Sequence, residues 1–196
     1  MSSRVIEIIT SSFTKLLIPG LVYTIPITLI SFAIGLLIAI VTALIRVKKI
    51  KVLSQIIQFY VWIFRGTPLL VQLFIIYYGL PSVGIVLEAF PAAIITFSLN
   101  VGAYSSETVR GAILSVDKRQ LEACYSVGMT YFQSMYHIIL PQALKIAIPP
   151  LFNSLIALVK DTSLAANITV AEMFMAHEIE KNCDKYTILE LYFNTS

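Results

Sequence analysis

Glu122-Ala123-Cys124-Tyr125-Ser126-Val127-Gly128, followed by Ile138-Ile139-Leu140-Pro141, lies in a polar segment enclosed by long apolar runs. Asp117 can cap a helix at the start of this segment, with Gln120 as its reciprocal partner, and Pro141 is expected to end the helix. We therefore predict an amphipathic helix across 117–141, whose apolar face either docks into a groove of a partner or lies on lipid headgroups. The apolar positions at helical spacing are Leu121, Cys124, Tyr125, Gly128, Met129, Phe132 and Met135.

The composition outside this segment indicates a membrane protein. Hydrophobic residues make up 58% of the chain and charged residues 13%, whereas about 25% of the residues in soluble domains are charged. A bilayer crossing needs about 20 apolar residues, and so few polar residues could not coat a large soluble core. The first run is too long for a signal peptide and is interpreted as a retained span. Uncharged runs cover 16–45, 52–64, 66–87, 89–106 and 146–159.

The basic residues predict the orientation, because loops rich in Lys and Arg stay in the cytoplasm. One basic group follows the first run and the second flanks the polar segment, so both are expected inside and the N-terminus outside. The predicted fold is an all-α transmembrane bundle with one domain over 1–196. The two groups are Arg46, Lys48, Lys49 and Lys51, and Arg110, Lys118, Arg119 and Lys145.

The charge pattern and the run lengths together give the predicted boundaries. Four spans are expected at about 16–45, 52–80, 89–111 and 142–165, with a cytoplasmic segment at about 112–141. An extracellular loop at about 166–186 would precede an incomplete last span from about 187. We interpret this end as a truncated fifth span. Four spans with an extracellular tail are the alternative.

The quoted stretch resembles the EAA motif in the membrane subunits of binding-protein-dependent ABC importers, with Cys124 in place of the usual second alanine. Three further stretches resemble the polar amino-acid permease branch of that family. Because four weak motifs occur in the family's order over about 65–165, together they are a strong signal. The three stretches are 64–72 (Phe-Arg-Gly-Thr-Pro-Leu-Leu-Val-Gln), 98–111 (Ser-Leu-Asn-Val-Gly-Ala-Tyr-Ser-Ser-Glu-Thr-Val-Arg-Gly) and 160–164 (Lys-Asp-Thr-Ser-Leu).

The resemblance implies a permease subunit of an ATP-driven importer in a prokaryotic cell (inner) membrane. In this family the EAA segment is a coupling helix held in a groove of an ATP-binding cassette subunit, a contact that would here involve Glu122, Ala123 and Gly128. Gly128 itself costs about 1 kcal/mol in a helix and indicates a bend or a close backbone approach. The resemblance also implies an extracellular or periplasmic binding protein, alternating access, and a dimer with a second copy or a paralogue.

No cofactor is expected on this chain, because it has no GxxxxGK[ST] loop for phosphate. ATP and Mg would belong to the partner, so the chain is not expected to be an enzyme. His137 and His177 each lack a second ligand at metal spacing, and no catalytic or metal site is predicted. The net charge of +3 is too small to suggest a nucleic-acid partner.

Polar residues at membrane depth mark a candidate substrate pathway, and the resemblance implies a zwitterionic polar amino acid as the substrate. Asn100, Tyr104 and Glu107 share one face of the third span, and Glu107 is expected to pair with Arg110 or with a basic group on another span. Hydrogen bonding between helices is the alternative role. The position of Ser154 is often acidic or amide-bearing in the resembled branch, so Ser154 gives no evidence for a cationic substrate. The predicted pathway residues are Gln72, Asn100, Tyr104, Glu107, Asn153 and Ser154.

Two backbone breaks are expected beside this pathway. Pro68 lacks a backbone donor, so a carbonyl one turn earlier needs another partner. Arg65 needs an anion, for which a structural carboxylate is favoured over substrate. Pro149 and Pro150 are expected to kink or restart the fourth span.

Two other classes of protein compete with the importer. An ion- or proton-coupled secondary carrier would use Glu107 as a proton site, but it has no use for the segment 117–141. A non-transporting scaffold or an inactive truncated fragment would fit the abrupt end at Ser196.

Overall fold

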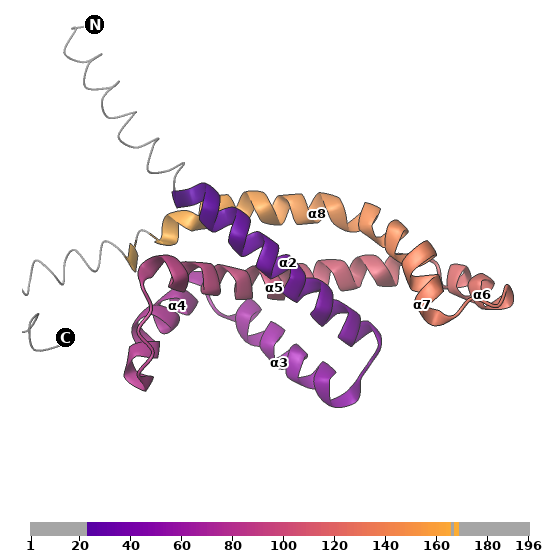
Figure 1. The fold of residues 1–196 in the computed structure, drawn as a ribbon, viewed down its shortest axis with the longest axis horizontal. Helices are drawn as coiled ribbons and strands as arrows, with labels where there is room; N and C mark the ends of the chain where they lie inside the picture. The colour runs from indigo at the N-terminus through magenta and orange to yellow at the C-terminus, as the bar shows by residue number, and fades with distance from the viewer. Residues whose placement is uncertain (1–22, 166, 169–196) are drawn as a thin grey trace, which may run out of the picture.

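The computed structural model describes residues 23–165 and 167–168, where the regular structure is helical throughout. The expected start of the first span, nearly all of the loop expected at 166–186 and the expected last span from 187 lie outside these residues. The α-helices, as labelled in Figure 1, are α2 (Ile25–Val47), α3 (Lys51–Gly66), α4 (Leu69–Phe74), α5 (Ala89–Ser115), α6 (Lys118–Ser126), α7 (Tyr131–Ser134) and α8 (Leu140–Asp161).

Helix α5 is the centre of the bundle and contacts α2, α3, α4 and α8. Figure 1 shows α2 crossing α5, with α8 and α3 on either side. Two glycines allow α2 and α5 to approach closely. A Cβ at Gly35 would lie 2.8 Å from the side chain of Val101, and a Cβ at Gly102 would lie 2.8 Å from Ile38 Cγ2. Small residues at a crossing point are typical of packed membrane helices.

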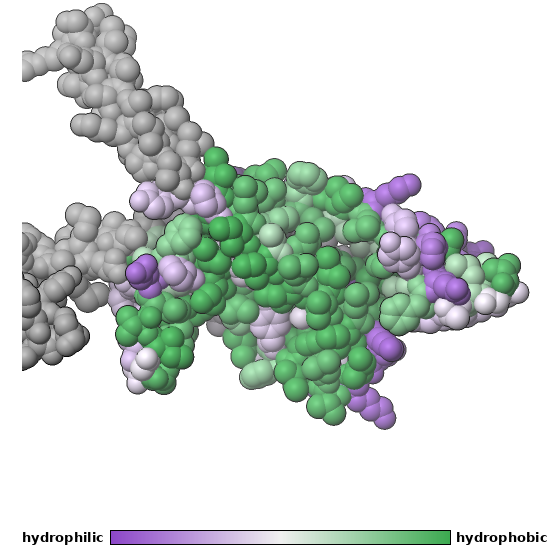
Figure 2. Space-filling view, in the orientation of Figure 1, coloured by the Kyte–Doolittle hydropathy of each residue, from purple (hydrophilic) through white to green (hydrophobic). Residues whose placement is uncertain are grey.

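The outer surface of the bundle is apolar. By length and composition, Ile25–Val47 and the continuous helix Tyr131–Ala165 can each cross a membrane, and the bent pair Lys51–Gly66 and Leu69–Val83 can form a third crossing. Figure 2 shows an apolar band over the helices, with hydrophilic residues gathered at the end that carries α6, α7 and the α2–α3 turn. The two basic groups therefore lie at one end of the band, as the charge pattern predicts.

The segment expected at 117–141 is not one helix, and that prediction is wrong. Helix α6 ends at Ser126, and Gly128 follows with φ +81°. The Gly128 amide donates to Tyr125 O and the Met129 amide to Cys124 O, both at 3.0 Å. These two bonds form a Schellman motif, whose left-handed position favours glycine. Of the two roles predicted for Gly128, a bend or a close backbone approach, the structure therefore shows the bend.

The helix caps confirm one prediction and correct another. Asp117 Oδ1 accepts from the Arg119 amide at 2.9 Å, so Asp117 caps α6 as expected. The reciprocal capping box forms instead at Thr130, whose hydroxyl accepts from the Gln133 amide while Gln133 Oε1 accepts from the Thr130 amide. The chain therefore restarts as a helix immediately after the Gly128 bend.

The second half of the segment belongs to the fourth span. Helix α7 continues through a π-helical turn, Met135–Ile139, into α8. Pro141 follows the π-helical turn directly and does not end a helix, contrary to prediction, because that turn already interrupts the i→i−4 hydrogen bonds that a proline would break. Helix α8 also runs through Pro149 and Pro150 without a break, so the restart considered for the fourth span does not occur.

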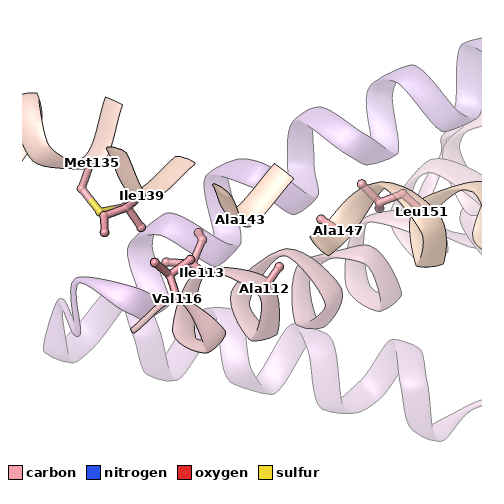
Figure 3. Close-up of a cluster of buried hydrophobic side chains, with 8 residues drawn as sticks. All are labelled: Ala112, Ile113, Val116, Met135, Ile139, Ala143, Ala147 and Leu151. Atoms are coloured by element: carbon pink, nitrogen blue, oxygen red, sulfur yellow. The ribbon is translucent and has the colours of Figure 1, made fainter. Parts of the chain in front are cut away.

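A buried apolar cluster fixes the base of α7 to the end of α5. Met135 and Ile139 contact the cluster beside Ile113 and Val116 (Figure 3). Ala143 and Ala147 continue the same face along α8. The bent segment from α6 to α7, here called the elbow (118–139), is therefore packed against the bundle.

Candidate functional site

The break between α3 and α4 occurs where the sequence predicts it, and the two helices are bent by 109°. Pro68 has no amide hydrogen, so it cannot donate to the Phe64 carbonyl one turn earlier. The Gln72 side chain supplies the missing donor, with Nε2 2.8 Å from Phe64 O and 2.9 Å from Thr67 O. The expectation that a carbonyl freed by Pro68 needs another partner is confirmed.

A cavity of about 270 Å³ lies beside this break. Three elements form its walls: the α3–α4 break, α5 and α8. Irregular backbone at membrane depth is tolerated where it is buried in protein or lines a water-filled cavity, which is the situation at this break. The lining residues are Thr67, Pro68, Leu69, Phe97, Asn100, Val101, Tyr104, Ser154, Ala157, Leu158 and Asp161.

Three of the six predicted pathway residues line the cavity: Asn100, Tyr104 and Ser154. Gln72 is buried behind the wall and accepts from Asn100 Nδ2 at 2.9 Å. Asn153, one residue from Ser154, is exposed and is not among the lining residues. The geometry therefore brings together residues of the second, third and fourth predicted spans.

Asp161 lines the cavity but is not among the pathway residues predicted from the sequence. Asp161 is the last residue of α8 and faces the same cavity as Asn100. Its position inside the 160–164 motif was the available signal. Among the described residues, no ion pair involves Asp161.

Arg65 lies at the rim of this site through its contact with Tyr104. Its guanidinium carbon is 5.4 Å from the centroid of the Tyr104 ring, a distance typical of a cation–π contact. The favoured expectation of a carboxylate partner is not met within residues 23–165 and 167–168. Asp161 thus lines the cavity, and the positive charge of Arg65 lies beside it.

Glu107 lies away from the cavity and joins two helices. It pairs with Arg46 of α2 and with Arg110 of α5, whose Nη2 is 2.8 Å from Glu107 Oε2. Both partners considered from the sequence, the i+3 arginine and a basic residue on another span, are present. Such an arrangement neutralises the carboxylate and fastens the basic ends of α2 and α5 together.

The elbow presents an exposed surface beyond the bundle. Glu122, Ala123 and Gly128 are exposed, whereas Cys124 faces inward and is buried. A shallow hollow of about 410 Å³ lies beside Gly128, between Val127 and His137. The large apolar side chains exposed on the elbow, here called the elbow patch, are Tyr125, Val127, Tyr131, Phe132 and Tyr136. Exposed apolar patches commonly mark protein contacts.

No cluster of three metal-ligating side chains occurs in the described part of the chain.

The comparisons with known proteins agree with this architecture. Residues 35–189 match the family described as "Binding-protein-dependent transport system inner membrane component". The chain is 49% identical to the L-cystine transport system permease protein TcyB of Bacillus subtilis (strain 168), covering 93% of this chain and 79% of TcyB. It is 37% identical to the arginine transport system permease protein ArtQ of the same organism, covering 89% of this chain and 80% of ArtQ.

A solved structure shows the same fold. A chain from "an amino acid ABC transporter with histidines" matches with a TM-score of 0.76 and 32% identity, covering 96% of this chain and 91% of that one. The apolar helices and this family membership make the chain a multi-pass protein of the cell membrane. It therefore belongs to the family of binding-protein-dependent transport system inner membrane components.

Proposed function

We propose that this chain is the permease subunit of an ATP-driven ABC importer of polar amino acids, which translocates its substrate by alternating access. The observation that carries the proposal is the cavity between the α3–α4 break, α5 and α8, with Asn100, Tyr104 and Ser154 in its wall. Relatives named as amino-acid permeases support the substrate class. The pathway residues are Asn100, Tyr104 and Ser154, with Gln72 behind them, whereas Glu107 has a fastening role.

The charges around the cavity suit a zwitterion. Asp161 lines the cavity and can pair with a substrate ammonium group, and Arg65 stands over the Tyr104 ring, where a substrate carboxylate can reach it. Tyr104 adds an aromatic ring to the wall of the cavity. This division of charge would fix the main-chain end of an amino acid and leave its side chain toward Ser154 and Phe97.

The elbow is proposed as the coupling contact with a separate ATP-binding cassette subunit. Its exposed Glu122, Ala123 and Gly128 carry the EAA resemblance, and the elbow patch offers the apolar area that a groove would cover. ATP and Mg would bind to that partner, and no cofactor would bind to this chain. Packing of Met135 and Ile139 on α5 would transmit a displacement of the elbow into the bundle.

The proposed orientation and partners of the permease complete the importer. The basic ends, with the elbow, would face the cytoplasm and the N-terminus would lie outside. An extracellular or periplasmic binding protein would deliver the substrate at the opposite end, and a second copy or a paralogue would complete the pathway.

The test is uptake of radiolabelled L-cystine by proteoliposomes that contain the permease, its ATP-binding cassette subunit and its binding protein, with L-arginine and L-glutamine as further probes. We expect uptake to require ATP, to be lost on Ser154→Trp and to survive Asn153→Trp, because only Ser154 lines the cavity. Uptake that collapses with an uncoupler at constant ATP would instead identify an ion-coupled carrier.

A further inference from the structure

Two side-chain amides meet behind the cavity wall, and backbone carbonyls decide which way each one points. Gln72 is only 5% exposed. One end of its amide faces Phe64 O at 2.8 Å, Thr67 O at 2.9 Å and Thr67 Oγ1 at 2.8 Å. Because a carbonyl oxygen can only accept, the end that faces two carbonyls must be the NH₂ group. The flip ambiguity usual for glutamine is therefore removed at Gln72.

This orientation passes on to Asn100. With its NH₂ group held by Phe64 and Thr67, Gln72 turns Oε1 toward α5, where it lies 2.9 Å from Asn100 Nδ2. Oε1 can only accept, so Asn100 must present its NH₂ group to Gln72. Asn100 lines the cavity, and its Oδ1 has no hydrogen-bond donor among the described residues. The cavity wall thus contains an acceptor oxygen whose direction is set from the α3–α4 break.

We infer that Gln72 is a positioning residue that fixes the Asn100 amide so that Asn100 Oδ1 accepts a hydrogen bond from the ammonium group of the substrate. The inference rests on the proposed function, since it names the group that the cavity recognises. A fixed acceptor suits an N–H donor and disfavours a carboxylate, whose oxygens would face another oxygen. Asp161 lines the same cavity and adds a negative charge of the sign that an ammonium group requires.

The experiment exploits the symmetry of a carboxylate. Both oxygens of an aspartate accept hydrogen bonds, so an Asn100→Asp variant does not need Gln72 to orient it. Binding of radiolabelled L-cystine, L-arginine and L-glutamine to the purified permease–ATPase complex is measured without the binding protein. In the Asn100 background, Gln72→Leu is expected to weaken binding by roughly 3- to 10-fold, the value of one hydrogen bond. In the Asn100→Asp background, the same change is expected to leave binding unchanged or to improve it.

A merely structural role predicts a different pattern. If Gln72 only satisfied the carbonyls at the break, Gln72→Leu would weaken binding by the same factor in both backgrounds, and that result would overturn the inference. Gln142→Leu is the matched control. Like Gln72, Gln142 donates from Nε2 to a backbone carbonyl, here Ile138 O at 3.1 Å, but it does not line the cavity.

A second measurement needs no substrate. Thermal unfolding of the same four proteins should show that Asn100→Asp lowers the Tm only when Gln72 is present, because an aspartate oxygen then faces Gln72 Oε1. An equal loss of Tm with Gln72 and with Gln72→Leu would disprove the fixed orientation. If the wild-type complex binds none of the three probes but the Tm pattern holds, the proposed substrate class fails and the orientation stands.

Discussion

Gly102 lies at a close contact between α2 and α5. A Cβ at this position would lie 2.8 Å from Ile38 Cγ2 and 2.9 Å from Tyr60 Oη, so these side chains or the helices that carry them would have to shift. We expect Gly102→Ala to lower the stability by about 1–3 kcal/mol, a usual cost of overpacking. Gly111→Ala on the same helix is the control: a Cβ there meets nothing within 4 Å, and alanine favours a helix by about 1 kcal/mol over glycine. In thermal unfolding in detergent, we therefore expect Gly102→Ala to lower the Tm and Gly111→Ala to raise it.

Glu107 is the residue whose loss should loosen the basic ends of α2 and α5. Glu107→Gln would leave Arg46 and Arg110 close together without a counter-charge, at side-chain exposures of 13% and 33%. We expect a loss of about 1–3 kcal/mol, between the values for exposed and buried pairs. Asp117→Asn is the control, because the Asp117–Arg119 pair is exposed and asparagine also caps helices. Equal unfolding temperatures for both variants would contradict the fastening role.

Among the elements, the elbow depends on the backbone conformation at its corner. With φ +81° at Gly128, an alanine there would cost about 1–2 kcal/mol, whereas asparagine tolerates this region better. We expect Gly128→Ala to reduce the amount of substrate carried per ATP hydrolysed and Gly128→Asn to reduce it less. Uptake and phosphate release are to be measured in the same proteoliposomes. An identical ratio in wild type and Gly128→Ala would argue against a role for the bend in coupling.

The elbow patch provides a separate test of docking. Phe132 is 78% exposed on α7, and Phe132→Glu would place a charge where a groove is proposed to close over it. We expect the variant to lose its ATP-binding cassette subunit during purification. Val86→Glu is the control. Val86 is 81% exposed, but it precedes the first residue of α5, whereas the elbow follows the last residue of α5. Equal recovery of the partner with both variants would place its contact elsewhere.

Much of the element level was accessible from the sequence. The break at Pro68, the Asp117 cap and the bend at Gly128 each follow from one residue's local chemistry. The capping box at Thr130 was also readable, because Thr130 and Gln133 have the required spacing. The continuity of α7 with α8 was not, since a proline usually breaks a helix and here follows a π-helical turn through which the helix continues.

The site required distances that no local pattern contains. Asn100, Tyr104 and Ser154 could be named from motifs and helical spacing. The link from Gln72 to Asn100 depends on the 109° bend, which returns α4 toward the end of α3. Asp161 was missed because a charge at a helix end is more often interfacial, and only the packing of α8 beside the break places it in the cavity.

For the whole molecule, the arrangement of charge predicts which end faces the cytoplasm. After Cys124 and Cys183 are replaced by serine, single cysteines at Arg119 and Val86 would report on the two ends, since both positions are highly exposed. We expect a membrane-impermeant maleimide to label Val86→Cys on sealed cells and Arg119→Cys only after lysis. The reverse labelling pattern would show that the proposed orientation is wrong and that the elbow lies on the side of the membrane away from a cytosolic ATPase.

The unbroken helix from α7 to the end of α8 has a mechanical consequence. Phe132 near one end and Asp161 near the other are separated by about 43 Å of helix at 1.5 Å per residue. If this helix tilts as one rigid rod by about 10° about the end that carries Phe132, its other end moves roughly 7.5 Å sideways, given this rise. The proposed partner contact and the wall of the cavity would then move together, and Pro149 and Pro150 mark where a long helix bends most easily.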